Sequence, residues 1–341
     1  YNKLPHRRLY WSTSPDLHNS LIAQSISRNV FDDIMRRLHF TDNMQNSEDR
    51  YFKVRPIFDI LNKSFKVLDN PKHLSIDETI VLYYGKHGTK QFIKGKPIRF
   101  GFKLWSLCTA DGYMVHAEPY CGSSTNLETS GKGQGYDVVF GLLKKAGIKK
   151  GSHIIFDNYF TSIDLLSDLA SKGIGATGTI RDNRVCKAPL TPKQKMQKKE
   201  RGAMESIVAN DVALVRWNDN SVVTVASNVV KTTPIMKAKR WSSKEKKSIQ
   251  INQPNSVAVY NRYMGGVDSH EQYVATYRIR IRSKKWWWPL FDLGLNAAMV
   301  NAWRFYRSLG HDIPLLAFQQ QCSSQLLVQY RKIARSPRSV S

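Results

Sequence analysis

Three aspartates occupy positions that suit a catalytic carboxylate. Asp77 lies within an apolar run, where removing a charged group from water is unfavourable unless a cation compensates it. Asp157 ends a second apolar run, at the place where ligands gather along the edge of an α/β sheet. Asp268 follows two glycines, and Glu271 comes one helical turn later on the same face. The sequence therefore predicts that four carboxylates converge.

Such a set of carboxylates is suited to phosphodiester chemistry. In that chemistry two divalent ions about 4 Å apart activate a water or a 3′-hydroxyl and stabilise the departing oxygen. The hard ion Mg²⁺, or Mn²⁺ in its place, takes oxygen ligands, so three or four carboxylates suffice. We expect two ions, with Asp77, Asp157 and Asp268 as catalytic metal ligands and Glu271 as a further ligand. Taken alone, Asp157 also fits a helix cap, and Glu271 a solvent-facing helix residue.

The charge of the chain indicates the substrate on which such a site would act. Its 52 lysines and arginines stand against 27 acidic residues, which gives a net charge of +25. This positive field concentrates polyanions, and nucleic acid is the expected partner. An anionic membrane is disfavoured, because no run approaches the roughly 18 apolar residues of a span and no charged-then-apolar leader opens the chain. We expect a soluble, intracellular protein with no small-molecule cofactor.

The cysteines do not indicate a zinc ribbon or a disulfide scaffold. They are scattered and include no C-x-x-C pair. The segment from His116 to Cys121 resembles part of the zinc deaminase signature but lacks its second cysteine, so we do not expect that activity.

The elements that would position the carboxylates follow from the hydrophobic pattern. Residues 16–40 and 59–68 have helical periodicity, so the N-terminal part is predicted to be all-helical. From residue 74 onward, β-branched and aromatic runs alternate with helical ones. The expected order is strands at 74–84, 102–109 and 113–120, a helix at 136–146, a strand at 152–156, a helix at 162–172 and a strand at 174–180. This is the order of an α/β, RNase H-like core with a mixed sheet.

Residues 181–254 interrupt this core and are predicted to form a β-rich insertion. Two strands, at 213–217 and 222–226, are expected between two basic runs. The first run, from Lys193 to Arg201, fits either a solvated loop or a segment for DNA contact or nuclear import. Helices are expected again over 257–277 and 290–309.

A third basic segment lies beside a tryptophan cluster and is a second candidate site. Basic side chains next to aromatic ones suit neutralisation of a DNA backbone and stacking on an unpaired base. The residues expected to contact DNA are Arg278, Arg280, Arg282, Lys284, Lys285 and Trp288. Trp288 also fits a buried core position.

Four motifs resemble the signature blocks of the piggyBac family of cut-and-paste transposases and their domesticated descendants. They are Ser75–Glu78, Phe156–Ser162, Tyr260–Asp268 and Arg282–Pro289. Tyr10–Ser12 and Arg37–Asn43 are similar to the N-terminal helical region of that family. The likeness extends over nearly the whole chain, in motif order and spacing as well as in residue types.

The resemblance implies a retroviral integrase-like core, interrupted after its fifth strand and flanked by a helical dimerisation and DNA-binding region. Members of the family excise an element through hairpin ends and insert it at TTAA. By position, Asp77, Asp157 and Asp268 match the metal ligands, and Glu271 stands where the family often has a further Asp. Trp288 matches an aromatic residue near the cleaved ends. The family's cysteine-rich zinc module has no counterpart in these 341 residues.

We therefore expect a Mg²⁺-dependent DNA transposase core that is nuclear, homodimeric and bound to double-stranded DNA at transposon ends and target sites. One alternative is a domesticated DNA-binding protein without strand cleavage. Another is an RNase H-like nuclease acting on RNA, which the helical N-terminal part and the Trp-rich C-terminal part disfavour. The expected parts are a dimerisation and DNA-binding region at 1–72, core segments at 73–180 and 257–335, an insertion at 181–256 and a flexible tail at 336–341.

Overall fold

The computed structural model describes residues 4–44, 47–93, 98–243, 245–278, 281 and 283–331. Within them the chain divides into two units. Unit 1 joins the two ends of the chain, residues up to Asp59 and from Tyr273, and unit 2 comprises Ile60–Gln272. The five expected parts are functional regions and not compact units, so that division stays a prediction. Its last part, the tail at 336–341, lies outside the described residues.

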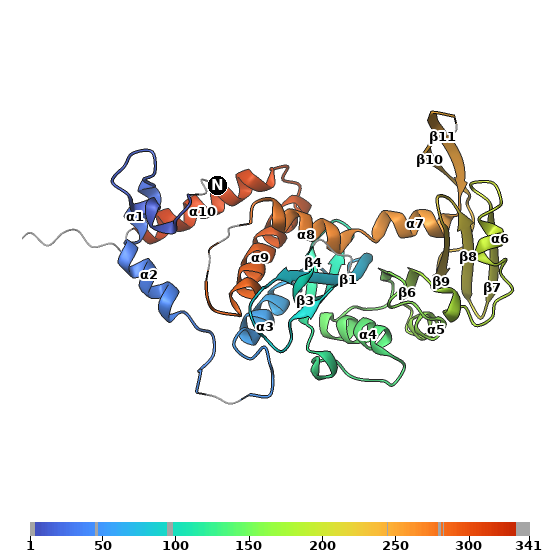
Figure 1. The fold of residues 1–341 in the computed structure, drawn as a ribbon, viewed down its shortest axis with the longest axis horizontal. Helices are drawn as coiled ribbons and strands as arrows, with labels where there is room; N and C mark the ends of the chain where they lie inside the picture. The colour runs from blue at the N-terminus through green and yellow to red at the C-terminus, as the bar shows by residue number, and fades with distance from the viewer. Residues whose placement is uncertain are drawn as a thin grey trace, which may run out of the picture. The chain divides into compact units, whose positions relative to one another are not determined.

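Unit 2 is built on a mixed sheet of nine strands, counted over the described residues (Figure 1). The sheet order is β2-β3-β1-β5-β6-β9-β8-β7, and β4 pairs with β3. The strands are β1 His73–Leu82, β2 Gln91–Phe92, β3 Phe100–Thr109, β4 Met114–Pro119, β5 His153–Phe156, β6 Gly175–Thr179, β7 Met204–Ala209, β8 Val212–Asn218 and β9 Val222–Ser227. Strands β1, β5 and β6 are parallel, whereas β1 and β3 are antiparallel. The expected α/β, RNase H-like class is confirmed, with the short β2 as an addition.

The helices of this core begin and end where local signals place them. They are α4 Gln134–Ala146 and α5 Ile163–Ser171. Gly147 ends α4 in the left-handed conformation at φ 75°, which a residue without a side chain adopts freely. The Ser162 side chain caps α5 by accepting from the Leu165 amide at 3.2 Å. Apolar side chains such as Leu142 and Leu166 are fully buried, so these helices cover the sheet.

The insertion is not a separate body, because three of its strands continue the core sheet. β6 pairs with β9 in antiparallel register, Thr177 opposite Ser227, and β8 and β7 follow outward. The expected strands at 213–217 and 222–226 are confirmed as β8 and β9. Three strands were not expected from the sequence: β7, and a two-stranded ribbon of β10 Met236–Ser242 and β11 Lys247–Gln253. The short helix α6 is Lys193–Met196, and single turns lie at η2 Gly122–Ser124 and η3 Asp182–Arg184.

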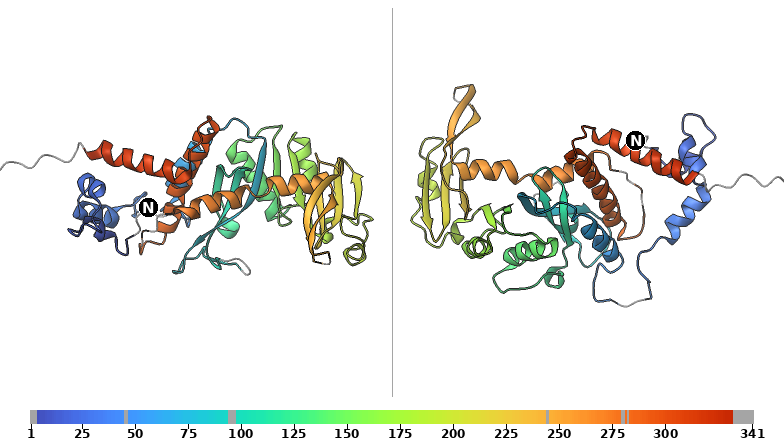
Figure 2. Two further views of the ribbon diagram at one scale, coloured as in Figure 1. Left: turned by 90° about the horizontal axis from the view of Figure 1, so that it is seen from above. Right: turned by 180° about the vertical axis from the view of Figure 1, so that it is seen from behind.

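After the ribbon, helices α7 Asn255–Tyr263 and α8 Gly266–Thr276 follow, where one helical segment was expected at 257–277. α7 lies against β9, β6 and β1. It continues directly from β11 through Pro254, as Figure 2 also shows.

Unit 1 is helical, as the N-terminal pattern predicts. Its elements are η1 Arg7–Trp11, α1 Ser20–Ser25, α2 Arg28–Arg37, α9 Trp288–Ser308 and α10 Leu315–Arg331, and α3 spans Arg55–Ser64. The stretch at 16–40 is not one helix, because Ile26 is extended (φ −148°) and the Ser27 side chain caps a new helix. α1 and α10 are neighbours, and Ser25 Oγ donates to the Leu327 carbonyl at 2.9 Å. No helix in the described ranges has the length and apolar character needed to cross a membrane.

Candidate active site

Strands β1 and β5 place the first two aspartates side by side. The strands are parallel, and Ile76 pairs with Phe156, so Asp77 and Asp157 are the next residues along the two strands. Asp77 is half-buried, which makes its burial less unfavourable than the apolar run suggested. Asp157 is also half-buried, and its Oδ1 accepts from the Tyr159 amide at 2.8 Å. Because Ser162 is the cap of α5, the helix-cap interpretation of Asp157 is wrong.

A close approach of α8 to the sheet positions the third aspartate. A Cβ atom on Gly266 would lie 2.3 Å from the Thr109 carbonyl oxygen and 2.6 Å from Ser75 Oγ, so only glycine fits there. One turn later, buried His270 hydrogen-bonds through Nδ1 to the Gly112 carbonyl at 2.9 Å. Asp268 follows Gly266 by two residues and is exposed.

Tyr260, on α7, shows that the three aspartates share one neighbourhood. Burial raises the pKa of Tyr260, and the charges of Asp157, Asp77 and Asp268 raise it further, while a hydrogen bond with Thr179 acts in the opposite direction. Electrostatic effects weaken with distance, so all three carboxylates lie near this one hydroxyl group. The three predicted residues therefore lie within electrostatic reach of one tyrosine, although they do not form a ready group of metal ligands.

Glu271 faces the same part of the sheet. The pKa of the Cys108 thiol is raised well above its usual value by burial, then by the charges of Glu271, Asp111 and Asp77. Cys108 lies on β3 opposite Ser75, two positions from Asp77 along β1. Glu271 is half-buried, so it is not the solvent-facing residue of the alternative interpretation.

The carboxylates fit a hard divalent ion in donor type. All four offer oxygen, which Mg²⁺ prefers, and Mg²⁺ needs only one or two carboxylates because it keeps several waters. Within the described residues, however, no three Asp, Glu, His or Cys side chains already form a group that could hold a metal. The three aspartates thus lie close enough to influence Tyr260, but they are too far apart to form one group of ligands.

Arg184 is a positioning residue that sequence reasoning missed. Its Nη1 donates to the carbonyl oxygens of Asn158, Tyr159 and Thr161, at 3.2, 2.9 and 3.1 Å. These carbonyls form the loop directly after Asp157, so one guanidinium holds the loop in place. Tyr260 was also missed, although it opens the motif that ends in Asp268. Proximity to the acids was the missing signal, and it exists only in the folded chain.

Three of the six residues expected to contact DNA near the tryptophan cluster, Arg278, Lys285 and Trp288, have partners within unit 1. Arg278 Nε lies 2.5 Å from Asp292 Oδ2. Lys284 is exposed, whereas Arg280 and Arg282 lie outside the described residues. DNA contact by these residues stays a prediction.

Lys285 and Trp288 also make contacts inside unit 1. Lys285 Nζ donates to the carbonyls of Arg36 and Leu38, at 3.1 and 2.7 Å, and so satisfies the end of α2. Trp288 is buried, and its indole nitrogen donates to the Ile281 carbonyl at 2.7 Å. Their expected role in DNA binding stays a prediction.

In the basic run from Lys193 to Arg201, Lys193 Nζ lies 3.5 Å from Asp182 Oδ1.

Comparison with known proteins gives consistent results. A family model described as "Transposase IS4" matches residues 1–303. The human PiggyBac transposable element-derived protein 3 is 39% identical over 313 residues, which cover 90% of this chain and 53% of that protein. The human PiggyBac transposable element-derived protein 2 is 36% identical over 329 residues, 94% and 55% of the two chains. The chain thus spans about half the length of these curated relatives.

A solved structure shares the fold. The cryo-EM structure of a piggyBac transposase synaptic complex with hairpin DNA superposes with a TM-score of 0.77 at 22% identity. The match covers 95% of this chain and 67% of the other.

Proposed function

The chain belongs to the piggyBac-type transposase family, and we propose that it is a core that cleaves and joins double-stranded DNA. The main support is that Asp77 and Asp157 directly follow the paired residues Ile76 and Phe156 of β1 and β5, and that both, with Asp268, act electrostatically on Tyr260. A net charge of +25 suits a phosphate backbone. Because the chain spans about half of its curated relatives, the activity of the whole protein is part of this proposal.

Asp77, Asp157 and Asp268 would hold divalent ions, with Glu271 as a further ligand. When bound, such ions supply activation of the attacking oxygen and stabilisation of the leaving one. Four carboxylates at one edge repel each other without a cation, which favours uptake of metal.

Other residues of the chain fix the geometry. Gly266 seats α8 on the sheet, and Arg184 holds the loop behind Asp157. The Tyr260 hydroxyl is protonated at neutral pH, as in any tyrosine, and burial raises its pKa further above the usual value. That hydroxyl can therefore donate a hydrogen bond to a phosphate or carboxylate oxygen in the site.

We also propose the finer features that the family resemblance implies. They are Mg²⁺ as the ion, hairpin intermediates, TTAA target sites, a homodimer and action in the nucleus. The solved relative is described as a synaptic complex with hairpin DNA, which is consistent with such a substrate. The basic runs are of the kind that serve nuclear import.

A second candidate function is a DNA-binding protein that performs no cleavage. Two observations favour it. The curated relatives are named as proteins derived from transposable elements. In addition, no ready-made metal group exists among the described residues.

Strand cleavage in Mg²⁺ distinguishes the two functions. The substrates are duplexes with hairpin-closed ends and TTAA at the junction, and binding to them is followed in parallel by fluorescence anisotropy. We expect Asp157→Asn to reduce cleavage by orders of magnitude and to leave binding intact, because Asn keeps the size of the side chain but not its charge. The matched control is Asp69→Asn, a surface residue whose side chain is 94% exposed.

If the unaltered chain binds these duplexes but shows no metal-dependent cleavage, the second function is correct. Equal cleavage by Asp157→Asn and the unaltered chain would instead show that the catalytic assignment is wrong.

A further inference from the structure

The β10–β11 ribbon is the part of unit 2 whose purpose the catalytic site does not explain. It forms a sheet of its own within the described residues. Figure 1 shows it extending past the ends of β8 and β9. A protruding pair of strands exposes many side chains to solvent, so the residues on its two faces decide what it can do.

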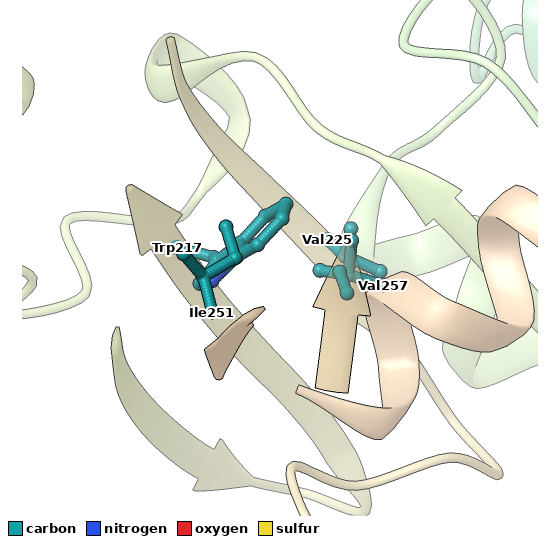
Figure 3. Close-up of a cluster of buried hydrophobic side chains, with 5 residues drawn as sticks. Trp217, Val225, Ile251 and Val257 are labelled. Carbon is teal, nitrogen blue, oxygen red and sulfur yellow. The ribbon is translucent and has the colours of Figure 1, made fainter. Parts of the chain in front are cut away.

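The inner face anchors the ribbon to the sheet. Ala238 and Ile251 are buried in a cluster with Trp217, Val225 and Val257, the last on α7 (Figure 3). The Trp217 indole also donates to a backbone carbonyl of β11, that of Asn252, at 2.8 Å. The base of the ribbon is thus fixed relative to β8, β9 and α7.

An ion-pair clamp fixes the ribbon further out. Asp219, in the turn between β8 and β9, binds Arg240 of β10 at 2.8 Å and Arg201 at 2.5 Å. Arg201 also donates to the Trp241 carbonyl at 3.0 Å. The ribbon therefore projects in one direction rather than swinging about its base.

The outer face carries a set of side chains suited to DNA. Strand alternation places three cross-strand pairs on it, and all six residues are exposed. The pairs are Lys237 with Asn252, Lys239 with Gln250, and Trp241 with Ser248. None of the six is acidic, and the Trp241 side chain is 61% exposed. Lysines neutralise phosphates, and the amides of Asn and Gln pair with base edges, adenine above all.

The direction of the ribbon brings this face to the catalytic edge. β5 and β6 are parallel and β9 runs opposite to them, so the β8–β9 turn lies at the edge where β5 ends in Asp157. Ala238 lies at the level of Val225 in the sheet, whereas Arg240 reaches Asp219 in that turn. Successive residues of β10 therefore approach this edge, and the tip extends beyond it.

The separation between β5 and β8 is short enough for one duplex to reach both strands. From β5 to β8 there are three strand spacings, or roughly 14 Å. At about 3.4 Å per base pair, this is roughly four base pairs.

We propose that the outer face of the β10–β11 ribbon, defined by Lys237, Lys239, Trp241, Ser248, Gln250 and Asn252, binds the groove of duplex DNA that is held at the catalytic edge. A two-stranded ribbon fits the major groove of B-form DNA. The proposal rests on the proposed function for the position of the DNA, because that function places a duplex at Asp157. The charge and shape of the ribbon are independent of it.

Binding measurements on the 341-residue chain test the proposal without requiring cleavage. The variant is Lys237→Ala with Lys239→Ala, and the probe is a labelled 30-base-pair duplex titrated over a range of salt concentrations. We expect affinity to fall at least tenfold and the slope of log affinity against log salt to decrease by about 1.8, since each lost phosphate contact removes about 0.9. The matched control is Lys149→Ala with Lys150→Ala, which lie before β5 at the opposite edge of the sheet.

Trp241→Phe provides a second measurement. If the ribbon lies on DNA, the duplex should quench tryptophan fluorescence in the unaltered chain more than in this variant. The thermal melting midpoint should remain unchanged in all variants, because the altered side chains are exposed.

These measurements distinguish failure of the ribbon proposal from failure of the proposed catalytic function. If the Lys237→Ala, Lys239→Ala double variant binds duplex DNA like the control, with the same salt slope, the ribbon proposal is wrong even when cleavage is normal. If this double variant loses affinity for single-stranded DNA and for duplex DNA equally, binding in a groove is also wrong. Loss of duplex affinity in a chain that never cleaves supports the ribbon while excluding the catalytic function.

Discussion

At the scale of single residues, the two glycines before Asp268 have different surroundings. A Cβ on Gly266 would collide with backbone and side-chain atoms of the sheet, whereas a Cβ on Gly265 would meet nothing within 4 Å. We expect Gly266→Ala to lower the free energy of unfolding by about 1–3 kcal/mol, as overpacking does, and to reduce cleavage by displacing Asp268. Gly265→Ala should leave both unchanged.

Urea denaturation and cleavage in Mg²⁺ check this prediction. Equal unfolding midpoints for the two glycine variants would mean that α8 does not depend on its close approach to β1 and β3.

A second prediction concerns Arg184, which binds three carbonyls of the loop after Asp157. Arg184→Ala should lower the free energy of unfolding by about 2 kcal/mol, because it leaves these acceptors without their charged donor. It should also weaken retention of Mn²⁺, measured by paramagnetic relaxation of water, since the loop no longer holds Asp157. The control is Arg181→Ala, because Arg181 donates to the side chain of Asn158 and not to the carbonyl oxygens that Arg184 binds. Equal Mn²⁺ affinity in the two variants would restrict Arg184 to a structural role.

The sequence predicted the positions of Asp77 and Asp157 because each depends on the strand that carries it, and strand patterns are local. Their roles as ligands stay predictions. Tyr260 and Arg184 could not be recognised in this way, since their neighbours come from distant segments. The burial of Asp77 was overestimated because an apolar run does not show which residue reaches an open edge.

At the scale of elements, the strands of the insertion differ in how well the sequence predicts them. β8 is buried along its whole length, and β9 begins with four β-branched residues in a row, which gives a clear strand signal. β10 and β11 carry lysines and amides on one face, and what holds them is packing on Trp217 and Val257. The alternation of Ile249 and Ile251 with polar residues in β11 is short and follows a basic run, so only a basic run was expected there.

The ion pairs of Asp219 with Arg240 and Arg201 predict a pH dependence of stability. Burial raises the pKa of Asp219, but hydrogen bonds from Arg240 and Arg201, together with their charges, outweigh it and hold this pKa below its usual value. A carboxylate with a lowered pKa stabilises the fold above its unfolded-state pKa, and this contribution is lost as pH falls through the lower, folded value. Asp219→Asn should therefore be less stable than the unaltered chain at pH 7, and the difference should shrink as the pH is lowered below about 4.

Urea denaturation across this pH range measures the effect. Limited proteolysis at pH 7 should also cut the ribbon of Asp219→Asn faster. A stability difference that is constant with pH would show that the clamp does not depend on ionised Asp219.

At the scale of the whole molecule, the positive charge predicts a strong salt dependence. If binding is mainly neutralisation of phosphates by six or more contacts, affinity for duplex DNA should fall about a thousandfold between 50 and 200 mM salt. Anisotropy titrations at several salt concentrations measure the slope. A flat response would contradict DNA binding by the basic surface as a whole.

The division into two units was beyond sequence reasoning. Unit 1 combines the first 59 residues with the segment after residue 272, and local periodicity carries no information on such pairing of chain ends. The order of elements along unit 2 was predictable because hairpins and strand–helix–strand patterns are local, whereas the pairing of β1 with β5 and of β6 with β9 joins distant segments. β4, for example, is paired to β3 by a tight turn, as the hairpin pattern predicts.

The pairing of β6 with β9 also limits how the protein can be shortened. If residues 204–227 were removed, β6 would become a bare edge strand, with Gly175, Ala176 and Gly178 unable to shield its backbone. Uncovered edges recruit strands from other molecules. Size-exclusion chromatography should therefore show aggregates of such a deletion variant where the unaltered chain does not aggregate, so a shortened version of this core must retain its insertion.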